Sequence, residues 1–141
     1  DLARRFWPGP LTLVLPRHPR VPAVLSGGGA TIAIRMPAHS VALALIRELG
    51  APLAATSANR SGEPSSVSAE EVMAQLGGRI PLLLDGGNCP GGVPSTVLDL
   101  TTELPTLVRP GPVGLDDWQD ILPGVVQQSQ GVSNLVDRRT P

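Results

Sequence analysis

The stretch Thr31–Met36 reads TIAIRM and is followed directly by Pro37. Successive side chains of a β-strand point to opposite faces of the sheet. One face of this stretch carries only apolar side chains, those of Ile32, Ile34 and Met36. The other face carries the Thr31 hydroxyl and the Arg35 guanidinium. The pattern therefore predicts a strand with one face in the core and one polar face that is available for chemistry.

Other short apolar runs, bounded by proline, glycine or polar loops, also indicate strands. They are Leu11–Leu15, Leu53–Ser57, Leu82–Asp85, Ser95–Leu100 and Thr106–Arg109. Apolar residues at helical spacing predict helices over His39–Leu49 and Ser68–Leu76. The second begins with a capping box, in which Ser68 and Glu71 exchange hydrogen bonds. Shorter helical segments are expected at Asp1–Trp7, near Ala23 and at Asp116–Leu122.

The order of these elements indicates the fold class. Strands alternate with helices in the middle of the chain and follow one another later, which predicts an α/β protein with a mixed sheet. Residues 1–122 are expected to form this domain. Residues 123–141 are mostly polar and are predicted to be a linker or a disordered tail.

Composition excludes several function classes for these 141 residues. All 11 basic residues are arginine, so a Walker-A lysine and a Schiff-base lysine are excluded. One cysteine and two histidines are too few for a structural zinc site. The lone cysteine indicates a reducing compartment, and no apolar run has the length of a membrane span.

A possible anion site follows from the ends of the predicted strands. Two arginines and two serines lie at or near these ends: Arg35, Arg109, Ser57 and Ser95. An arginine fork binds carboxylate or phosphate through two hydrogen bonds, and serine hydroxyls can complete the binding shell. Alternatively, each arginine pairs with a structural aspartate, Asp85 or Asp99, and binds no ligand.

The segment Thr56–Gly62 (TSANRSG) is a dense run of small polar residues after a predicted strand. Its amide and hydroxyl groups would suit a phosphate. The alternative is a turn in which Asn59 and Gly62 serve the backbone conformation.

Five blocks of the chain resemble the YrdC family, the L-threonylcarbamoyladenylate synthases. They are Phe6–Thr12, Ile34–Pro37, Thr56–Gly62, Pro94–Asp99 and Val108–Gly111. The resemblance extends to about Leu122 and covers the later two-thirds or so of the family's domain. It implies a YrdC-like fold, a twisted open mixed sheet with flanking helices, here incomplete at the N-terminus.

The resemblance also implies an activity. Family members are cytoplasmic nucleotidyltransferases that join L-threonine, bicarbonate and ATP into threonylcarbamoyl-AMP and release pyrophosphate. A carbamate of threonine attacks the α-phosphorus of ATP, with Mg²⁺ bridging phosphate oxygens and no side-chain nucleophile. Partner proteins then transfer the threonylcarbamoyl group to an adenosine of tRNA.

Site residues are implied position by position. Three residues resemble those that face the threonine: Arg35, Ser95 and, through its backbone, Ala55. Four resemble those that line the ATP pocket: Thr31, Ser57, Ser65 and Arg109. The family's upstream Lys-Arg-Pro…Lys-Pro segment has no counterpart in this lysine-free sequence. We therefore expect the isolated chain to bind ATP weakly and to turn over little or nothing.

Two alternatives keep the fold and change the function. One is a domain that adenylates carbamate from carbamoyl phosphate, as in hydrogenase-maturation proteins. The other is a non-catalytic paralogue that binds double-stranded RNA or tRNA. The formal net charge of −1 disfavours RNA binding, which usually needs a broad positive surface.

Overall fold

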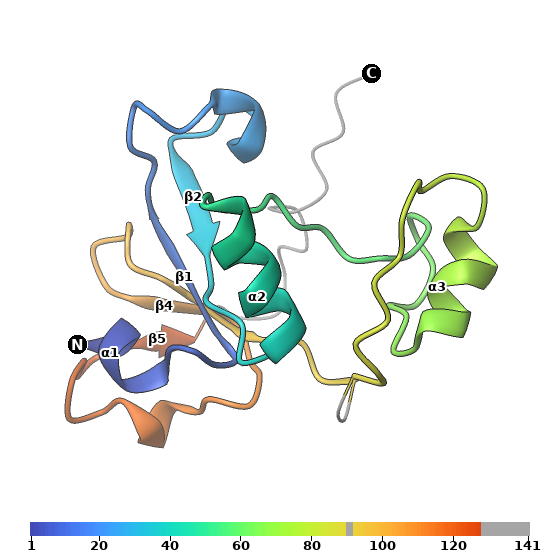
Figure 1. Ribbon diagram of the computed structural model, residues 1–141. Helices are drawn as coiled ribbons and strands as arrows, with labels where there is room; N and C mark the ends of the chain where they lie inside the picture. The colour runs from blue at the N-terminus through green and yellow to red at the C-terminus, as the bar shows by residue number, and fades with distance from the viewer. Residues whose placement is uncertain (90–91, 128–141) are drawn as a thin grey trace. The chain divides into compact units, whose positions relative to one another are not determined.

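The computed structural model describes residues 1–89 and 92–127, and these divide into two compact units (Figure 1). The sheet unit comprises Asp1–His39 and the chain from Pro94 onward. The helical unit comprises Ser40–Val93.

The sheet unit is built on five strands in the order β2-β1-β3-β4-β5. Their bounds are β1 Leu11–Pro16, β2 Thr31–Ile34, β3 Thr96–Asp99, β4 Thr106–Arg109 and β5 Val126–Gln127. β1 runs parallel to β3 and antiparallel to β2, while β4 is antiparallel to β3 and parallel to β5. Figure 1 shows these strands side by side, with the early and late parts of the chain joined in one sheet. The predicted α/β class with a mixed sheet is confirmed.

Short helices complete both units. The sheet unit contains α1 (Leu2–Phe6) and the 3₁₀ turns η1 (Ala23–Ser26) and η3 (Leu115–Asp117). The helical unit contains α2 (Ser40–Leu49) and α3 (Ala69–Leu76). The predicted terminal helix at Asp116–Leu122 is thus reduced to one 3₁₀ turn and a further turn closed by the Leu122 amide on the Trp118 carbonyl.

The core of the sheet unit follows the alternation of β1. Leu11 and Leu13 are buried on one face, while Thr12 between them is directed to the other. On β3 and β4, Leu98 and Leu107 lie opposite each other in the ladder, and both are buried. Trp118 is fully buried beside them in the same cluster.

The predicted apolar face of Thr31–Met36 is only partly buried. Ile34 and Met36 remain 41% and 39% exposed. β2 lies at one edge of the sheet, and the buried apolar side chains come instead from α1, β1, β3, β4 and the segment around η3. The expectation of a core face at Ile34 and Met36 is therefore wrong.

Two predicted strands, Leu53–Ser57 and Leu82–Asp85, are absent: both segments are irregular. A strand is stable only when a neighbour takes up its backbone hydrogen bonds. No other strand forms in the described part of the helical unit, so neither run has a partner there. Most of their apolar side chains stay exposed, with Leu82 at 71%, while Leu83 is half-buried.

The ends of the helices largely follow the sequence signals. The Ser68 hydroxyl accepts a hydrogen bond from the Glu71 amide at 3.3 Å, as the capping box predicts. The Glu71 carboxylate reaches one residue further back than expected and accepts from the Val67 amide at 2.7 Å. Gly50, with φ of +64°, ends α2 and donates its amide to the carbonyls of the last turn.

Part of the predicted tail is structured. Val126 and Gln127 form β5 beside β4, and the Val126 amide donates to the Pro105 carbonyl at 2.9 Å. Residues 128–141, the rest of the predicted linker or disordered tail, lie outside the described residues.

The buried side chain of Thr96 connects the segment after β4 to the sheet through hydrogen bonds. Its replacement tests the fold. The fully buried Thr96 hydroxyl donates to the Val113 carbonyl at 2.8 Å and accepts from the Val113 amide at 3.0 Å. Thr96→Val should lower the free energy of unfolding by about 2–4 kcal/mol, because two buried backbone groups lose their partner. Urea denaturation measures this, with Thr96→Ser as the matched control that keeps the hydroxyl. Equal stability of Thr96→Val and the unaltered chain would show that the hydrogen bonds between Thr96 and Val113 do not stabilise the fold.

Candidate anion-binding site

Arg109 is the last residue of β4, and its guanidinium hydrogen-bonds to Ser95, the residue just before β3. Nε and Nη2 of Arg109 donate to the Ser95 carbonyl at 3.0 and 2.9 Å. Nη2 also donates to the Ser95 hydroxyl at 3.1 Å. Ser95 is only 7% exposed, and the contact with Arg109 holds its hydroxyl oxygen in place. The structure thus brings together two of the residues that the sequence predicted for the site.

A third strand joins this contact through Thr12 on β1. Thr12 Oγ1 lies 2.7 Å from Ser95 Oγ, so the two hydroxyls share a hydrogen bond. Thr12 was not among the residues predicted for the site. The signal that would have found it is the alternation of β1, which puts a lone hydroxyl opposite two core leucines.

The Pro110–Pro112 turn after β4 lies tightly against the Ser95 backbone. A Cβ on Gly111 would stand 2.4 Å from the Thr96 nitrogen, 2.7 Å from the Pro94 oxygen and 2.8 Å from the Ser95 carbonyl carbon. Only glycine allows this approach. The turn therefore fixes the backbone at the end of β4, from which the Arg109 side chain extends to Ser95.

Arg35 lies directly after β2 in the same unit and is exposed. Partial burial and, second, the positive charge of Arg35 lower the pKa of Arg109 below its ordinary value. The positive charges of the two guanidinium groups thus disfavour each other. An anion placed beside both would relieve that repulsion.

The alternative that each arginine serves a structural aspartate is not supported. The Asp99 carboxylate accepts from the amide and hydroxyl of Thr101 at 2.8 and 2.7 Å. The Asp85 carboxylate accepts from the Gly87 amide at 2.8 Å. Over residues 1–89 and 92–127, neither Arg35 nor Arg109 forms an ion pair.

Thr31 begins β2 and pairs with Pro16 of β1. It shares a strand face with Arg35, but four residues of extended chain separate the two by roughly 13 Å. The structure therefore places Thr31 in the sheet unit with Arg35, Ser95 and Arg109, at the far end of its strand.

The other three predicted site residues, Ala55, Ser57 and Ser65, belong to the helical unit, where all are exposed. The segment Thr56–Gly62 is held by its own contacts: Asn59 Nδ2 donates to the carbonyls of Arg60 and Glu63, both at 2.9 Å. Gly62 has φ of +85°, whereas Asn59 does not adopt a left-handed conformation. These contacts favour the turn interpretation, with glycine rather than asparagine in the special backbone position.

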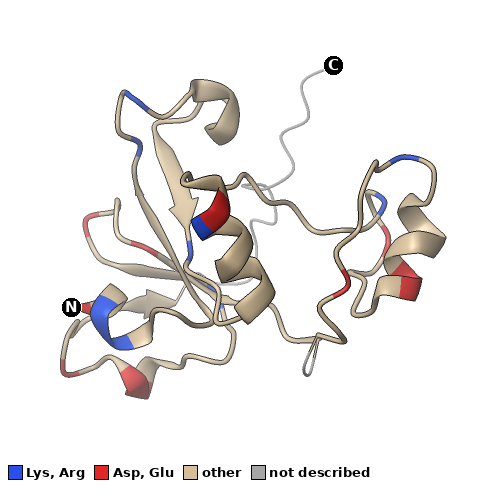
Figure 2. Cartoon of the chain, viewed as in Figure 1, with Lys and Arg blue, Asp and Glu red and all other residues tan. Residues whose placement is uncertain are grey.

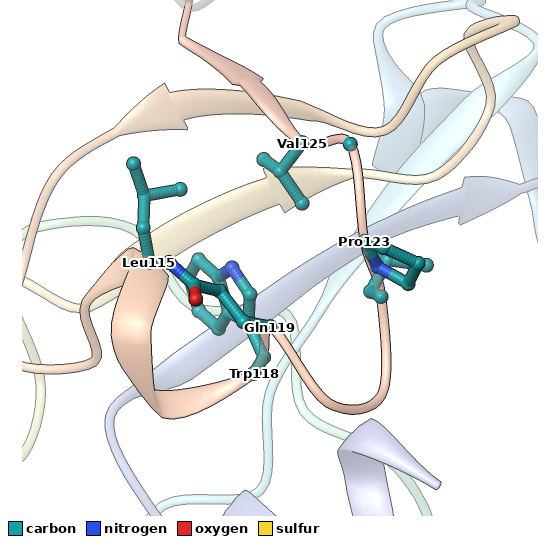
Figure 3. A pocket seen from close by; sticks show the side chains of 7 residues that line it. Leu115, Trp118, Gln119, Pro123 and Val125 are labelled. Atoms are coloured by element: carbon teal, nitrogen blue, oxygen red, sulfur yellow. The ribbon is translucent and has the colours of Figure 1, made fainter.

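A separate cavity of about 330 Å³ lies between η3 and β5, and no predicted site residue lines it (Figure 3). Leu115, Trp118, Gln119 and the segment Leu122–Val125 form its walls. The Trp118 indole nitrogen is buried and has no hydrogen-bond partner in the described part of the chain. The lining is mostly apolar, so this hollow does not suit an anion.

Charge elsewhere is mixed. Figure 2 shows basic and acidic residues interspersed along the described part of the chain. Within those residues no group of three or more His, Cys, Asp and Glu side chains is arranged to hold a metal ion. None of the described helices is both long and apolar enough to cross a membrane.

Comparison with known proteins identifies the family of this chain. The Sua5/YciO/YrdC family model, described as "Telomere recombination", matches residues 1–111. The threonylcarbamoyl-AMP synthase of Pyrococcus abyssi is 51% identical over 121 residues, which are 86% of this chain and 36% of the relative. That of Bacillus subtilis is 46% identical over 134 residues, 94% of this chain and 38% of the relative. The chain thus spans little more than a third of the length of these two relatives.

Solved structures show the same fold. The crystal structure of Pyrococcus abyssi Sua5 complexed with L-threonine superposes with a TM-score of 0.85 at 49% identity and covers 90% of this chain and 37% of that one. Escherichia coli YciO superposes with a TM-score of 0.63 at 31% identity and covers 77% of this chain and 53% of that one. With a family match over residues 1–111 and a shared fold, the chain belongs to the Sua5/YciO/YrdC family.

Proposed function

We propose that this chain carries part of the active site of a threonylcarbamoyl-AMP synthase. The reaction joins L-threonine, bicarbonate and ATP into threonylcarbamoyl-AMP, with release of pyrophosphate and water. The observation that carries the proposal is the Arg109–Ser95 contact beside Arg35, two guanidinium groups without a carboxylate partner among the described residues. This arrangement lies in a chain 51% identical to a relative of that name.

The threonine half of the site is Arg35, Ser95 and the backbone of Ala55. Arg35 is exposed and forms no ion pair within the described residues, so its fork is available to the threonine carboxylate. The Ser95 hydroxyl, fixed by Arg109, would donate to the same substrate. The role of Ala55 is proposed from the family resemblance alone.

The ATP half is Arg109, Thr31, Ser57 and Ser65. Arg109 keeps a positive charge at the end of β4 and would stabilise charge on the phosphates. Thr31 would offer its hydroxyl from the first residue of β2. Ser57 and Ser65 are proposed from the resemblance alone.

The chemistry needs positioning more than a nucleophilic side chain. The carbamate oxygen attacks the α-phosphorus of ATP, and the bond to the leaving pyrophosphate breaks. Arginine groups stabilise the negative charge that shifts to the leaving group. From the family resemblance, we assign no side chain of this chain to Mg²⁺. We further propose that the product passes, in the cytoplasm, to proteins that modify tRNA.

Threonine binding by Arg35→Ala tests this function. Loss of the carboxylate's charged partner should weaken L-threonine binding to the 141-residue chain by about 5- to 150-fold, the equivalent of about 1–3 kcal/mol. Titration followed by NMR measures the affinity even when it is weak. Arg4→Ala, an exposed arginine of α1 in the same unit, is the matched control and should bind as the unaltered chain does.

Two outcomes would contradict the proposal. Unchanged affinity of Arg35→Ala would remove Arg35 from the site. Salt-sensitive binding of double-stranded RNA by a chain that does not bind threonine would favour the RNA-binding alternative instead.

A further inference from the structure

We propose that Thr12 is a positioning residue that sets the direction of the Ser95 hydroxyl proton. This inference rests on the proposed function, because it concerns how Ser95 meets the threonine substrate. With an anionic group bound, Thr12 donates to Ser95 Oγ, and the Ser95 proton turns toward the anion. Thr12 acts through Ser95 and need not touch the substrate.

The bonding capacity of the Ser95 hydroxyl limits what its neighbours can do. A hydroxyl has one proton to donate and two lone pairs to accept with. Arg109 can only donate, so its 3.1 Å contact occupies one lone pair of Ser95 Oγ. The 2.7 Å contact with Thr12 then takes either the second lone pair or the proton. If Thr12 donates, the Ser95 proton is left for a ligand.

Binding of an anion changes which of the two hydroxyls donates. Without one, the Ser95 proton can be donated to Thr12, which keeps the buried hydroxyl satisfied. With a carboxylate nearby, a charge-assisted hydrogen bond from Ser95 to that carboxylate is stronger than one to Thr12. The two hydroxyls rotate, and Thr12 becomes the donor. Ser95 is thus fully hydrogen-bonded in both states and loses no partner on binding.

The hydroxyl of Thr12 has a role that is separate from the structural role of its β-branched side chain. Thr12 pairs in register with Val97 of β3 and is flanked by buried leucines, so a β-branched residue suits the position in any case. Valine would satisfy that requirement equally well. Among the described contacts, the hydroxyl of Thr12 serves only Ser95. The strand alone would therefore accept valine at position 12, and the hydroxyl of threonine serves a different purpose.

The test is a double-mutant cycle on L-threonine affinity in the 141-residue chain, with Thr12→Val, Ser95→Ala and the double variant. Thr12→Val should weaken threonine binding by about 3- to 10-fold, the scale of one lost hydrogen bond. In the Ser95→Ala background the same substitution should change the affinity less than 2-fold, roughly the limit of additivity. Thr12→Ser, which keeps the hydroxyl, should restore binding.

Other outcomes would overturn the inference. Wild-type affinity of Thr12→Val would show that the Thr12 hydroxyl is not needed. An equal loss in both backgrounds would show that Thr12 acts on the fold and not through Ser95. If Thr12→Val does not fold, Thr12→Ala enters the same cycle. Failure of the unaltered chain to bind threonine at all would overturn the proposed function, and this inference with it.

Discussion

Gly111→Ala should destabilise the sheet unit by at least about 3 kcal/mol, beyond the usual cost of an added methyl group. The new Cβ would meet the Thr96 nitrogen at 2.4 Å, the Pro94 oxygen at 2.7 Å and the Ser95 carbonyl carbon at 2.8 Å. All three are backbone atoms, so no side-chain rotation can relieve the clash. Either the turn after β4 moves away from Ser95 or the ladder between β3 and β4 opens.

The measurement is urea denaturation, with Gly114→Ala as the matched control. Gly114 has φ of −94°, and a Cβ there would meet only the Asp117 carboxylate oxygen at 3.7 Å. Alanine at this control position should change the stability by less than about 1 kcal/mol. Equal unfolding midpoints for the two variants would show that the turn does not press on Ser95.

Replacement of Arg109 should have the second large effect, on both stability and anion binding. Arg109→Ala removes three hydrogen bonds and leaves the buried Ser95 carbonyl without its two donors. We expect a loss of about 2–4 kcal/mol in the free energy of unfolding. Affinity for ATP, measured by NMR titration, should fall at least about 10-fold, because a charged partner of the phosphates is lost.

Arg109→Lys separates the two contributions of this side chain. Lysine keeps the positive charge but cannot place two donors on the Ser95 carbonyl as the Nε and Nη2 pair does. The lysine variant should recover part of the ATP affinity and little of the stability. Full recovery of both would mean that charge alone is required and that the fork geometry is irrelevant.

How far the sequence predicts this structure depends on whether an element finds its partner nearby. The Leu11–Leu15 run and the cap at Ser68 follow from local pattern, and both are confirmed. Leu53–Ser57, another run predicted as a strand, forms none, because pairing is a tertiary event that a single run cannot specify. β5 was missed for the converse reason: two residues in a polar segment pair with β4.

The site was predicted in part. The predicted strand ends pointed to four residues: Arg35, Ser57, Ser95 and Arg109. The structure puts Arg109 on Ser95 and Arg35 in the same unit, whereas Ser57 belongs to the helical unit, in a segment that forms no strand. The contact itself depends on the antiparallel pairing of β3 with β4 and the irregular register between Val97 and Leu98. No sequence spacing encodes that register.

We propose that Arg35, Ser95 and Arg109 form one site for an anionic substrate. The most direct measurement is a crystal structure of the chain grown with L-threonine. We predict the threonine carboxylate within about 3 Å of the Arg35 guanidinium and of Ser95 Oγ. Threonine bound elsewhere, with Arg35 and Ser95 both left uncontacted, would contradict it.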